Sequence, residues 1–210
     1  MRKNQYINNQ TFKINVQKNI PQGSGLGGGS ANAASLLNFL ISKMRLKISK
    51  TSIKKIATKV GSDVVVSLVK KNTFLNGKTG KILRLKKKFE LNILIVYPQI
   101  VCSTKKIYNK NKTFSKTKSK SIYYIKNKDQ LISFLANDKN DLQKTVVNFY
   151  PKIGKIIDLL KNSKGCYFSR ITGSGSACIG IFSDKRTAIL TQKMIKLKFP
   201  KYWSVVSKTI

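Results

Sequence analysis

One segment constrains the fold of this chain more than any other, because five glycines fall within the seven residues from Gly23 to Gly29. Before this segment, Thr11 to Ile20 alternate apolar and polar side chains, which predicts a half-buried β-strand. After it, Ala31 to Met44 place apolar residues at three- and four-residue steps, which predicts a helix. A strand, a glycine-rich loop and a helix in succession can bind an anion. Glycines let backbone N–H groups approach a phosphate, and the helix N-terminus offers further unpaired N–H groups.

The loop differs from the two commonest nucleotide-binding loops. A Walker A loop ends in Gly-Lys-Ser or Gly-Lys-Thr, whereas this loop ends in Gly29-Ser30-Ala31. A dinucleotide-binding loop requires an acidic residue about 20 residues further on, and Ile48 to Thr51 contain none. The alternative interpretation of this segment is a flexible linker without a binding role, but a linker would not run directly into an Ala-rich amphipathic helix. We therefore expect a nucleotide-phosphate loop made of Pro21, Gln22, Gly23, Ser24, Gly25, Leu26, Gly27, Gly28, Gly29, Ser30 and Ala31.

The net charge of +35, from 42 basic and 7 acidic residues, has two interpretations. One is binding to nucleic acid, and the other is a compositional bias toward Lys, Asn and Ile. Only five of the basic residues are Arg, the residue that contacts phosphates and bases through two parallel hydrogen bonds. The Lys residues are also spread along the whole chain. We therefore favour the compositional bias and expect no nucleic-acid partner, although the charge would attract anionic substrates at long range.

The three cysteines, Cys102, Cys166 and Cys178, are isolated in the sequence, and the chain has no histidine. This pattern argues against a zinc site and favours reduced, buried thiols. No apolar run approaches the ~18 residues that a membrane span requires. The first residues also lack the apolar stretch of a secretory signal. We expect a cytoplasmic protein that has no contact with membranes.

The remaining elements indicate an α+β fold in which helices pack on a mixed or antiparallel sheet. Further helices are expected at 49–60, where Gly61 ends the helix, and at 128–136, 141–149, 152–160 and 185–198. Further strands are expected at 73–75, 81–85, 91–97, 166–171, 177–182 and 203–207, with the first two joined through Gly77 and Gly80. The polar stretch 109–121 is expected to be a loop.

The segment Pro21 to Ala34 (PQGSGLGGGSANAA) resembles the second motif of the GHMP small-molecule kinases. It is most similar to the members that phosphorylate a cytidyl-linked erythritol in the non-mevalonate isoprenoid pathway. The three consecutive glycines followed by Ser30 carry this similarity, because homoserine and mevalonate kinases usually have Gly-Leu-Gly-Ser-Ser in that place.

Four further segments resemble the family in the same order along the chain. They are Gly61-Ser62-Asp63-Val64, the stretch from Pro98 to Tyr108, Asn140-Asp141-Leu142 with the following Tyr150-Pro151, and Arg170 to Ser176. Each segment is weak alone, but together they are specific and cover nearly the whole chain.

The resemblance implies a two-domain GHMP kinase fold. Residues 1–86 would form an ATP-binding domain whose N-terminal part is missing, and residues 87–210 a C-terminal ferredoxin-like α/β sandwich. The resemblance also implies ATP and Mg²⁺ as cofactors and a small-molecule cytidyl substrate. No Mg²⁺ ligand can be read from the sequence beyond Ser30 as a candidate, and the oligomeric state is not indicated.

Asp63 is the expected catalytic residue, since the resemblance aligns it with the family's catalytic carboxylate. A carboxylate at the edge of the core can accept a proton from a substrate hydroxyl. The structural alternative is a helix N-cap for residues 64–68. The same resemblance places Thr104, Thr172, Gly173, Ser174 and Gly175 near the substrate. Their structural alternatives are an N-cap for residues 105–109 and an ordinary hairpin turn.

Two segments of the family pattern have no counterpart in this sequence, an Ala-Lys-Ile-Asn strand with the catalytic Lys and a Gly-Tyr-His segment that binds cytosine. Lys13-Ile14-Asn15 resembles the Ala-Lys-Ile-Asn segment only superficially, because it directly precedes the glycine-rich loop. We therefore expect an N-terminally truncated kinase, most simply a fragment of a longer chain. Three alternatives stay open: another GHMP kinase of homoserine or mevalonate type, an inactive remnant, and a basic nucleic-acid-binding protein.

Overall fold

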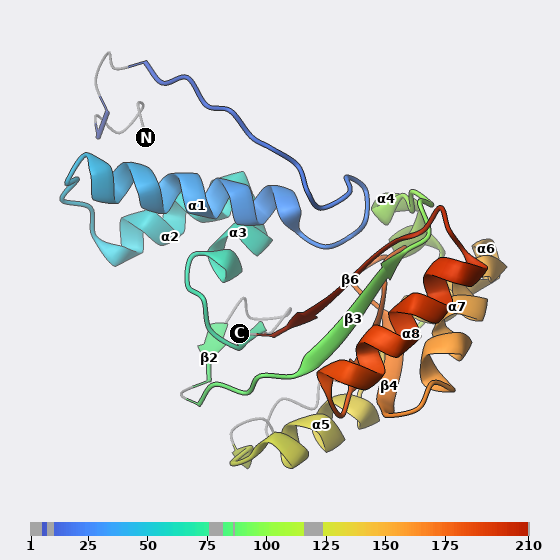
Figure 1. The fold of residues 1–210 in the computed structure, drawn as a ribbon. Coiled ribbons are helices and arrows are strands. Elements are labelled where there is room, and N and C mark those ends of the chain that lie inside the picture. Colours follow the sequence, from blue (N-terminus) through green and yellow to red (C-terminus); the bar gives the residue numbers. More distant parts are fainter. Residues whose placement is uncertain (1–5, 8–10, 76–81, 86, 116–123, 210) are drawn as a thin grey trace. The chain divides into compact units, whose positions relative to one another are not determined.

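The computed structural model describes residues 6–7, 11–75, 82–85, 87–115 and 124–209. The chain divides into two compact units (Figure 1). The N-terminal unit consists of residues 1–19 and 27–85, and the C-terminal unit consists of residues 20–26 and 86–210. The boundary between the units thus falls inside the glycine-rich loop, between Leu26 and Gly27. The turn expected through Gly77 and Gly80, and part of the polar stretch 109–121, lie outside the described residues.

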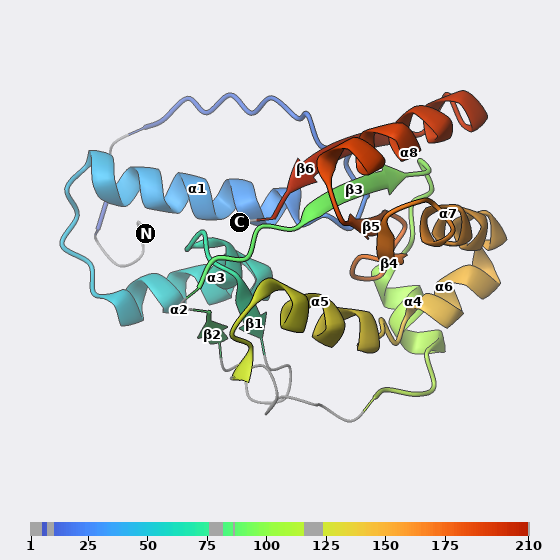
Figure 2. The ribbon, with the colours of Figure 1, turned by 60° about the horizontal axis from the view of Figure 1, so that its bottom comes forward.

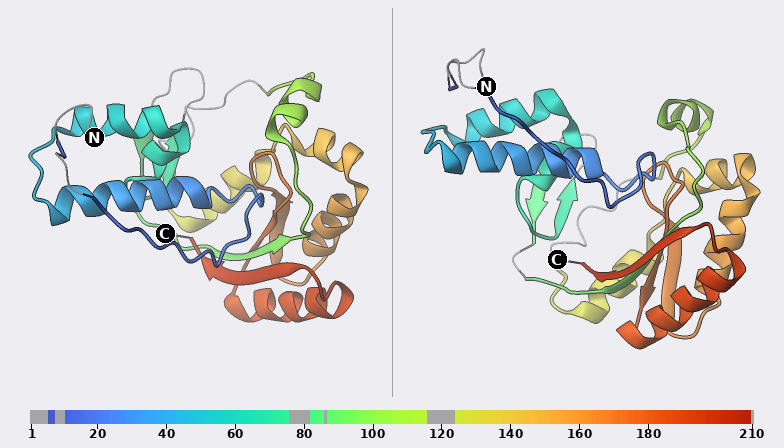
Figure 3. Two further views of the ribbon diagram at one scale, coloured as in Figure 1. Left: turned by 90° about the horizontal axis from the view of Figure 1, so that it is seen from above. Right: turned by 45° about the horizontal axis from the view of Figure 1, so that its top comes forward.

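Among the described residues, the N-terminal unit contains three helices and a pair of short antiparallel strands (Figure 3). The elements are α1 (Gly28–Lys43), α2 (Lys50–Val60), α3 (Ser62–Ser67), β1 (Thr73–Leu75) and β2 (Ile82–Arg84). Helix α1 packs against α2 and α3. The buried core of the unit is small and consists of Ala34, Leu37, Ala57, Val64 and Val65.

A short polar residue and a glycine mark the ends of α2. Ser49 caps α2 by accepting a hydrogen bond from the Ser52 N–H at 3.1 Å. Gly61 then serves as the C-cap of α2 and the N-cap of α3 at once. The helix predicted at 49–60 and its end at Gly61 are confirmed. Helix α1 begins three residues earlier than predicted, because Gly28, Gly29 and Ser30 already form its first turn.

The strand predicted from Thr11 to Ile20 is wrong. These residues form no strand, and the apolar side chains of Phe12, Ile14 and Val16 are 44 to 53% exposed. Alternation of apolar and polar residues predicts a strand only where a neighbouring strand supplies the hydrogen-bond ladder and a core covers one face. Among the described residues no strand pairs with this segment.

The C-terminal unit is built on a four-stranded antiparallel sheet with the strand order β4-β5-β3-β6 (Figure 1). The strands are β3 (Asn92–Tyr97), β4 (Cys166–Ile171), β5 (Cys178–Phe182) and β6 (Trp203–Lys208). The helices are α4 (Thr104–Lys110), α5 (Lys128–Asn137), α6 (Gln143–Phe149), α7 (Pro151–Lys161) and α8 (Lys185–Lys198). If α4 to α7 are counted as one helical connection, the element order is β-α-β-β-α-β, the ferredoxin-like arrangement. The predicted α+β class and the C-terminal sandwich are confirmed.

Two helices cover the sheet. Helix α7 packs on β4 and β5, and helix α8 packs on β3 and β6 (Figures 1 and 2). One continuous cluster of buried side chains joins both helices to the strands, so both cover the same face. The cluster includes Leu94 and Val96 from β3, Cys178 and Phe182 from β5, and Ile153, Ile156, Leu160, Ala188 and Ile195 from the two helices.

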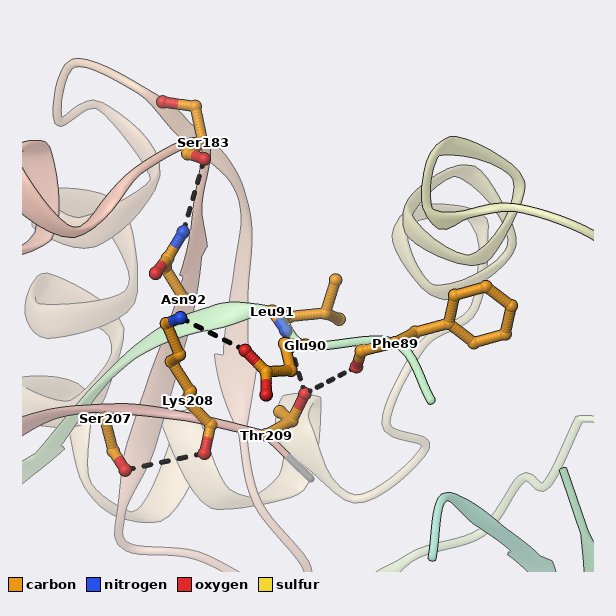
Figure 4. Close-up of polar contacts among 8 residues, drawn as sticks. All are labelled: Phe89, Glu90, Leu91, Asn92, Ser183, Ser207, Lys208 and Thr209. Carbon is orange, nitrogen blue, oxygen red and sulfur yellow. Dashed lines mark hydrogen bonds and ion pairs between the residues drawn. The ribbon is translucent and has the colours of Figure 1, made fainter. Parts of the chain in front are cut away.

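The end of the chain is fastened to the start of β3 (Figure 4). The Thr209 hydroxyl accepts a hydrogen bond from the Leu91 N–H and donates one to the Phe89 carbonyl, both at 2.9 Å. The Lys208 ammonium group pairs with the Glu90 carboxylate at 3.1 Å. Both charged side chains are more than half exposed, so this ion pair contributes little. The hydrogen bonds of Thr209 are therefore the main polar anchor of this end.

No helix among the described residues is both long and apolar enough to cross a membrane.

Arg84 connects β2 to the end of α3 and to β1 through side-chain hydrogen bonds. Its guanidinium group donates hydrogen bonds to the carbonyl oxygens of Val66 at 2.7 Å, Val65 at 2.9 Å and Val69 at 3.3 Å, and to the Thr73 hydroxyl. Partial burial lowers the pKa of Arg84. The planar, five-donor guanidinium group is suited to bridging the last carbonyls of a helix and a hairpin strand.

We predict that Arg84→Met destabilises the N-terminal unit by about 1–3 kcal/mol, because the carbonyl groups lose their donor while the apolar stem remains. Urea unfolding followed by circular dichroism measures the change. Arg45→Met is the matched control at an exposed position of the same unit, and it should change the free energy of unfolding by less than about 0.5 kcal/mol. Equal effects of the two substitutions would contradict the role of Arg84.

The cysteine thiols are predicted to be unreactive in the folded protein. Burial raises the pKa of Cys178 to about 12 and that of Cys166 to about 11, and it also raises the pKa of Cys102. Because the thiolate is the reactive form, a thiol reagent at neutral pH should modify the native chain slowly and the urea-unfolded chain rapidly. Mass spectrometry would assign the modified cysteine, and rapid labelling of native Cys178 would contradict the prediction.

Candidate active site

The first half of the glycine-rich loop is packed on the C-terminal unit. Ser24 is buried, and its hydroxyl donates to the Pro21 carbonyl at 2.7 Å. The Ser24 carbonyl accepts a hydrogen bond from the Ala177 N–H at 3.2 Å. The Tyr97 hydroxyl donates to the Gln22 carbonyl at 3.3 Å. This half of the loop therefore has a fixed conformation against the glycine turn that precedes β5.

Gly25 is the point of closest approach between the loop and that turn. Its φ of +75° lies in the left-handed region, and an added Cβ would lie 2.5 Å from the Gly175 carbonyl oxygen. Gly175 has a φ of +82°. Only glycine combines this backbone conformation with so close an approach. Two glycine-rich segments that are 150 positions apart in the sequence therefore lie in backbone contact.

The second half of the loop forms the start of α1 in the N-terminal unit. The first intrahelical bond joins the Ala31 N–H to the Gly27 carbonyl at 3.0 Å. The N–H groups of Gly28, Gly29 and Ser30 precede it and have no acceptor within the helix. The helix has no acidic residue in its first turn and no side-chain cap. An added Cβ at Gly28 or Gly29 would meet nothing within 4 Å. Free N–H groups, a helix dipole and open space are what an anion such as a phosphate requires.

Asp63 lies in the first turn of α3, with its side chain exposed. The Ser62 hydroxyl donates to its carboxylate at 3.4 Å, and its own carbonyl accepts a hydrogen bond from the Ser67 hydroxyl at 2.9 Å. Gly61, not Asp63, is the N-cap of α3, so the capping alternative for Asp63 is wrong. Its carboxylate therefore does not cap the helix. A negative charge in the first turn also interacts favourably with the helix dipole.

The turn formed by Thr172, Gly173, Ser174 and Gly175 contacts Thr104 directly. The Thr104 and Ser174 hydroxyl oxygens are 2.8 Å apart. Ser103 is the N-cap of α4, and Thr104 is the first helical residue, so the capping alternative for Thr104 is also wrong. The structure thus brings all five residues that were expected near the substrate into one cluster of the C-terminal unit.

A cavity of about 480 Å³ opens beside this turn. Its lining includes Thr172, Gly173, Tyr108 and Phe114. The two aromatic rings stack with centroids 6.3 Å apart, and both side chains are more than half exposed. The cavity lining therefore combines polar groups with an aromatic surface.

The cavity-lining residues that the sequence-based site residues omit include three polar ones, Asn140, Asp141 and Arg170. Asn140 donates to the carbonyls of Ile171 and Gly173, and Asp141 accepts from Ser115. The Arg170 guanidinium group donates to the carbonyls of Leu135 and Asp138, and burial lowers the pKa of Arg170. The motif Asn140-Asp141-Leu142 was the available signal, but an Asn-Asp pair before a helix is ordinary for a helix start.

The described residues provide no ready-made metal cluster. No three His, Cys, Asp or Glu side chains gather among the parts of the chain that the structure describes. Ser30, in the first turn of α1, is the hydroxyl nearest in sequence to the free N–H groups.

Comparison with known sequences identifies the class of protein that carries these features. Residues 1–71 match the sequence profile of the GHMP kinases N terminal domain, and residues 125–201 match that of the GHMP kinases C terminal domain. The two matched regions include the glycine-rich loop, Asp63 and the turn before β5. The sequence thus contains both halves of the GHMP kinase pattern.

Three curated relatives are all 4-diphosphocytidyl-2-C-methyl-D-erythritol kinases. The relative from Pelagibacter ubique is 40% identical over 97% of this chain and 71% of its own length. Those from Anaplasma phagocytophilum and Wolbachia pipientis wMel are 34% and 36% identical over 94% and 90% of this chain. This chain spans 66% and 65% of their lengths. The chain belongs to the GHMP kinases and, within them, to the 4-diphosphocytidyl-2-C-methyl-D-erythritol kinase family.

Solved structures agree on the fold. A 4-(cytidine 5'-diphospho)-2C-methyl-D-erythritol kinase matches with a TM-score of 0.70 at 19% identity, covering 90% of this chain and 68% of that chain. A homoserine kinase from Cytophaga hutchinsonii matches with a TM-score of 0.71 at 15% identity, covering 92% of this chain and 68% of that chain. Similar TM-scores for kinases of different substrates show the fold alone.

We predict that Gly25→Ala disrupts the packing of residues 20–26 on the C-terminal unit, because the new methyl group would collide with the Gly175 carbonyl. The melting temperature should fall by several degrees, as expected for a loss of about 1–3 kcal/mol. Gly29→Ala is the matched control, since its Cβ meets nothing within 4 Å and Ala is favoured in a helix. A Gly25→Ala variant as stable as Gly29→Ala would contradict the close contact.

Proposed function

We propose that this chain carries out the reaction named in its relatives, transfer of the γ-phosphoryl group of ATP to a hydroxyl of 4-diphosphocytidyl-2-C-methyl-D-erythritol. The observation that carries the proposal is the 40% identity to the Pelagibacter ubique kinase over 97% of this chain. The fold alone would fit a homoserine kinase equally well.

The glycine-rich loop would hold the triphosphate of ATP. Its second half offers the free N–H groups of Gly28, Gly29 and Ser30 at the positive end of a 16-residue helix. Its first half has a fixed conformation against the C-terminal unit through Ser24 and Gly25. Phosphoryl transfer depends mainly on positioning and on stabilising charge. A loop with many free N–H groups and a fixed end meets both requirements.

Asp63 would accept the proton of the substrate hydroxyl as that oxygen attacks the γ-phosphorus. It is exposed, it is not used as a cap, and it lies in the first turn of α3. A base within hydrogen-bond reach of the reacting hydroxyl is the usual requirement for this chemistry.

The cavity beside Thr172 and Gly173 would hold the cytidyl part of the substrate. The exposed rings of Tyr108 and Phe114 offer a surface on which a base can stack, which contributes about 1–3 kcal/mol per base in proteins that bind single strands. The hydroxyls of Thr104 and Ser174, which already contact each other, offer hydrogen bonds to polar groups of the substrate.

Mg²⁺ would accompany the triphosphate, with Ser30 as the candidate protein ligand. When bound, the ion neutralises charge on the phosphate oxygens. The cytoplasm, where ATP is available, is the proposed compartment.

The nucleic-acid alternative is less well supported. Of the five Arg residues, Arg84 and Arg170 already donate to backbone carbonyls within their own units. They are therefore not free to read bases. A salt titration of DNA and RNA binding would test this alternative, because binding through many phosphates weakens steeply with salt.

A coupled assay for ADP release tests the proposed function. It compares the cytidyl substrate with homoserine and mevalonate, using the 210-residue chain. We expect ADP release that depends on the cytidyl substrate. Release that depends on homoserine or mevalonate would keep the kinase class and reject the substrate. No release with any of the three would reject the proposal for this chain.

We predict that Asp63→Asn lowers turnover by a factor on the order of 10² or more while ATP binding is kept, because a positioned base is worth about that much. Asp129→Asn is the matched control, since Asp129 is also exposed and also the second residue of its helix. Both substitutions remove one favourable charge from a helix start, but only the first should affect turnover. Similar turnover in the two variants would remove Asp63 from this role.

A further inference from the structure

Asn140 makes three hydrogen bonds that connect the start of α6 to the glycine turn. Its side-chain amide nitrogen donates to the Ile171 carbonyl at 3.2 Å and to the Gly173 carbonyl at 2.8 Å. Its side-chain oxygen accepts from the Leu142 N–H at 2.9 Å. The two acceptor carbonyls lie on either side of Thr172, so one amide group holds both flanks of that residue.

The turn cannot easily hold this position by itself. Its internal bonds join the Gly175 N–H to the Thr172 carbonyl and the Thr172 N–H to the Ala177 carbonyl, each at 2.9 Å. Gly173 and Gly175 have positive φ angles and no side chains to pack. Bonds from outside the turn therefore help to hold it. The Ser176 hydroxyl donates to the Ile100 carbonyl, and Asn140 extends from the start of α6, where Leu142 and Val146 are buried in the core.

The neighbouring residue, Asp141, is bonded to another segment that lines the cavity. The Asp141 carboxylate accepts hydrogen bonds from the Ser115 N–H at 2.8 Å and from the Ser115 hydroxyl. Ser115 follows Phe114, which lines the cavity together with Tyr108. Two adjacent side chains thus bind two cavity-lining segments, Asn140 the glycine turn and Asp141 the segment of Phe114.

We propose that Asn140 is a positioning residue of this kinase, whose amide group sets the place of the glycine turn and thereby the place of the substrate. This inference rests on the proposed function for its effect on turnover. Asn140 donates to backbone carbonyls on both sides of Thr172, so it would act through the turn. The turn in turn contacts Thr104 through Ser174 and the glycine-rich loop through Gly175. A shift of the turn would therefore disturb both the substrate contact and the loop.

Asn140→Asp is the informative substitution, because it keeps the acceptor oxygen for the Leu142 N–H and replaces the donor NH₂ group by oxygen. A carboxylate oxygen would face two carbonyl oxygens and repel them. A protonated carboxyl group could instead donate to one of them, and its pKa should be raised by the same repulsion. We expect turnover about 10- to 100-fold below the unsubstituted protein near pH 8, with partial recovery as the pH falls toward about 5.

Two variants separate this effect from simple damage. Asn140→Ala removes both donor and acceptor, so it should lower turnover without recovery at low pH. Asn162→Asp adds the same charge at an exposed position of the same unit, and its pH profile should follow that of the unsubstituted protein. Identical pH profiles for Asn140→Asp and Asn140→Ala would overturn the role of the lost donor.

Hydrogen exchange supplies a readout that does not depend on activity. At neutral pH, amides of residues 172–177 should exchange faster in Asn140→Asp and Asn140→Ala than in Asn162→Asp. Unchanged exchange in the turn overturns the positioning role, whatever the turnover. If the unsubstituted protein releases no ADP with the cytidyl substrate, the proposed function fails, and the exchange measurement still decides whether Asn140 holds the turn.

Discussion

The backbone contact between Gly25 and Gly175 is the constraint on which the proposed site depends. A side chain at Gly25 would lie 2.5 Å from the Gly175 carbonyl oxygen, so the two segments can meet only if position 25 has no side chain. The Ala177 N–H bond to the Ser24 carbonyl fixes the same approach from the next residue. Because of this contact, the first half of the glycine-rich loop folds with the C-terminal unit, although it is distant in sequence.

The large positive charge contributes little to the contacts that hold the described segments together. The ion pair between Lys208 and Glu90 is exposed, and the hydrogen bonds that fasten segments to one another come mostly from hydroxyl, amide and guanidinium groups. Arg84 and Arg170 serve as donors to backbone carbonyls, which ties two of the five arginines to folding. The excess Lys residues thus fit a general bias of composition, with a long-range attraction for anionic nucleotides as a consequence.

Periodicity predicted the strands and most helices of the C-terminal unit, whereas its ferredoxin-like arrangement was expected from the family resemblance. Strands β3 to β6 and helices α7 and α8 lie where apolar patterns place them, because each buries its own pattern in one core. The same reasoning failed for Thr11 to Ile20, where alternation is present but no described strand pairs with the segment. The same reasoning also predicted a start of α1 that is three residues too late. Consecutive glycines are typical of a loop, although Gly28 and Gly29 here form the first turn of the helix.

The site was only partly predictable. Glycine spacing indicated the loop and the turn, but no pattern indicates that Gly25 touches Gly175 or that Asn140 supports the turn. These contacts join residues 31 to 150 positions apart and depend on the packed sheet. Asp63 was found through resemblance, since a single acidic residue at a helix start has an ordinary structural explanation.

The most direct test of the central claim is hydrogen exchange of the 210-residue chain with and without a non-hydrolysable ATP analogue and Mg²⁺. We expect slower exchange at the amides of residues 23–31, because phosphate oxygens would occupy the free N–H groups of the loop and the start of α1. Slower exchange elsewhere with no change in residues 23–31, or no change anywhere at saturating analogue, would contradict the assignment of this loop to the triphosphate.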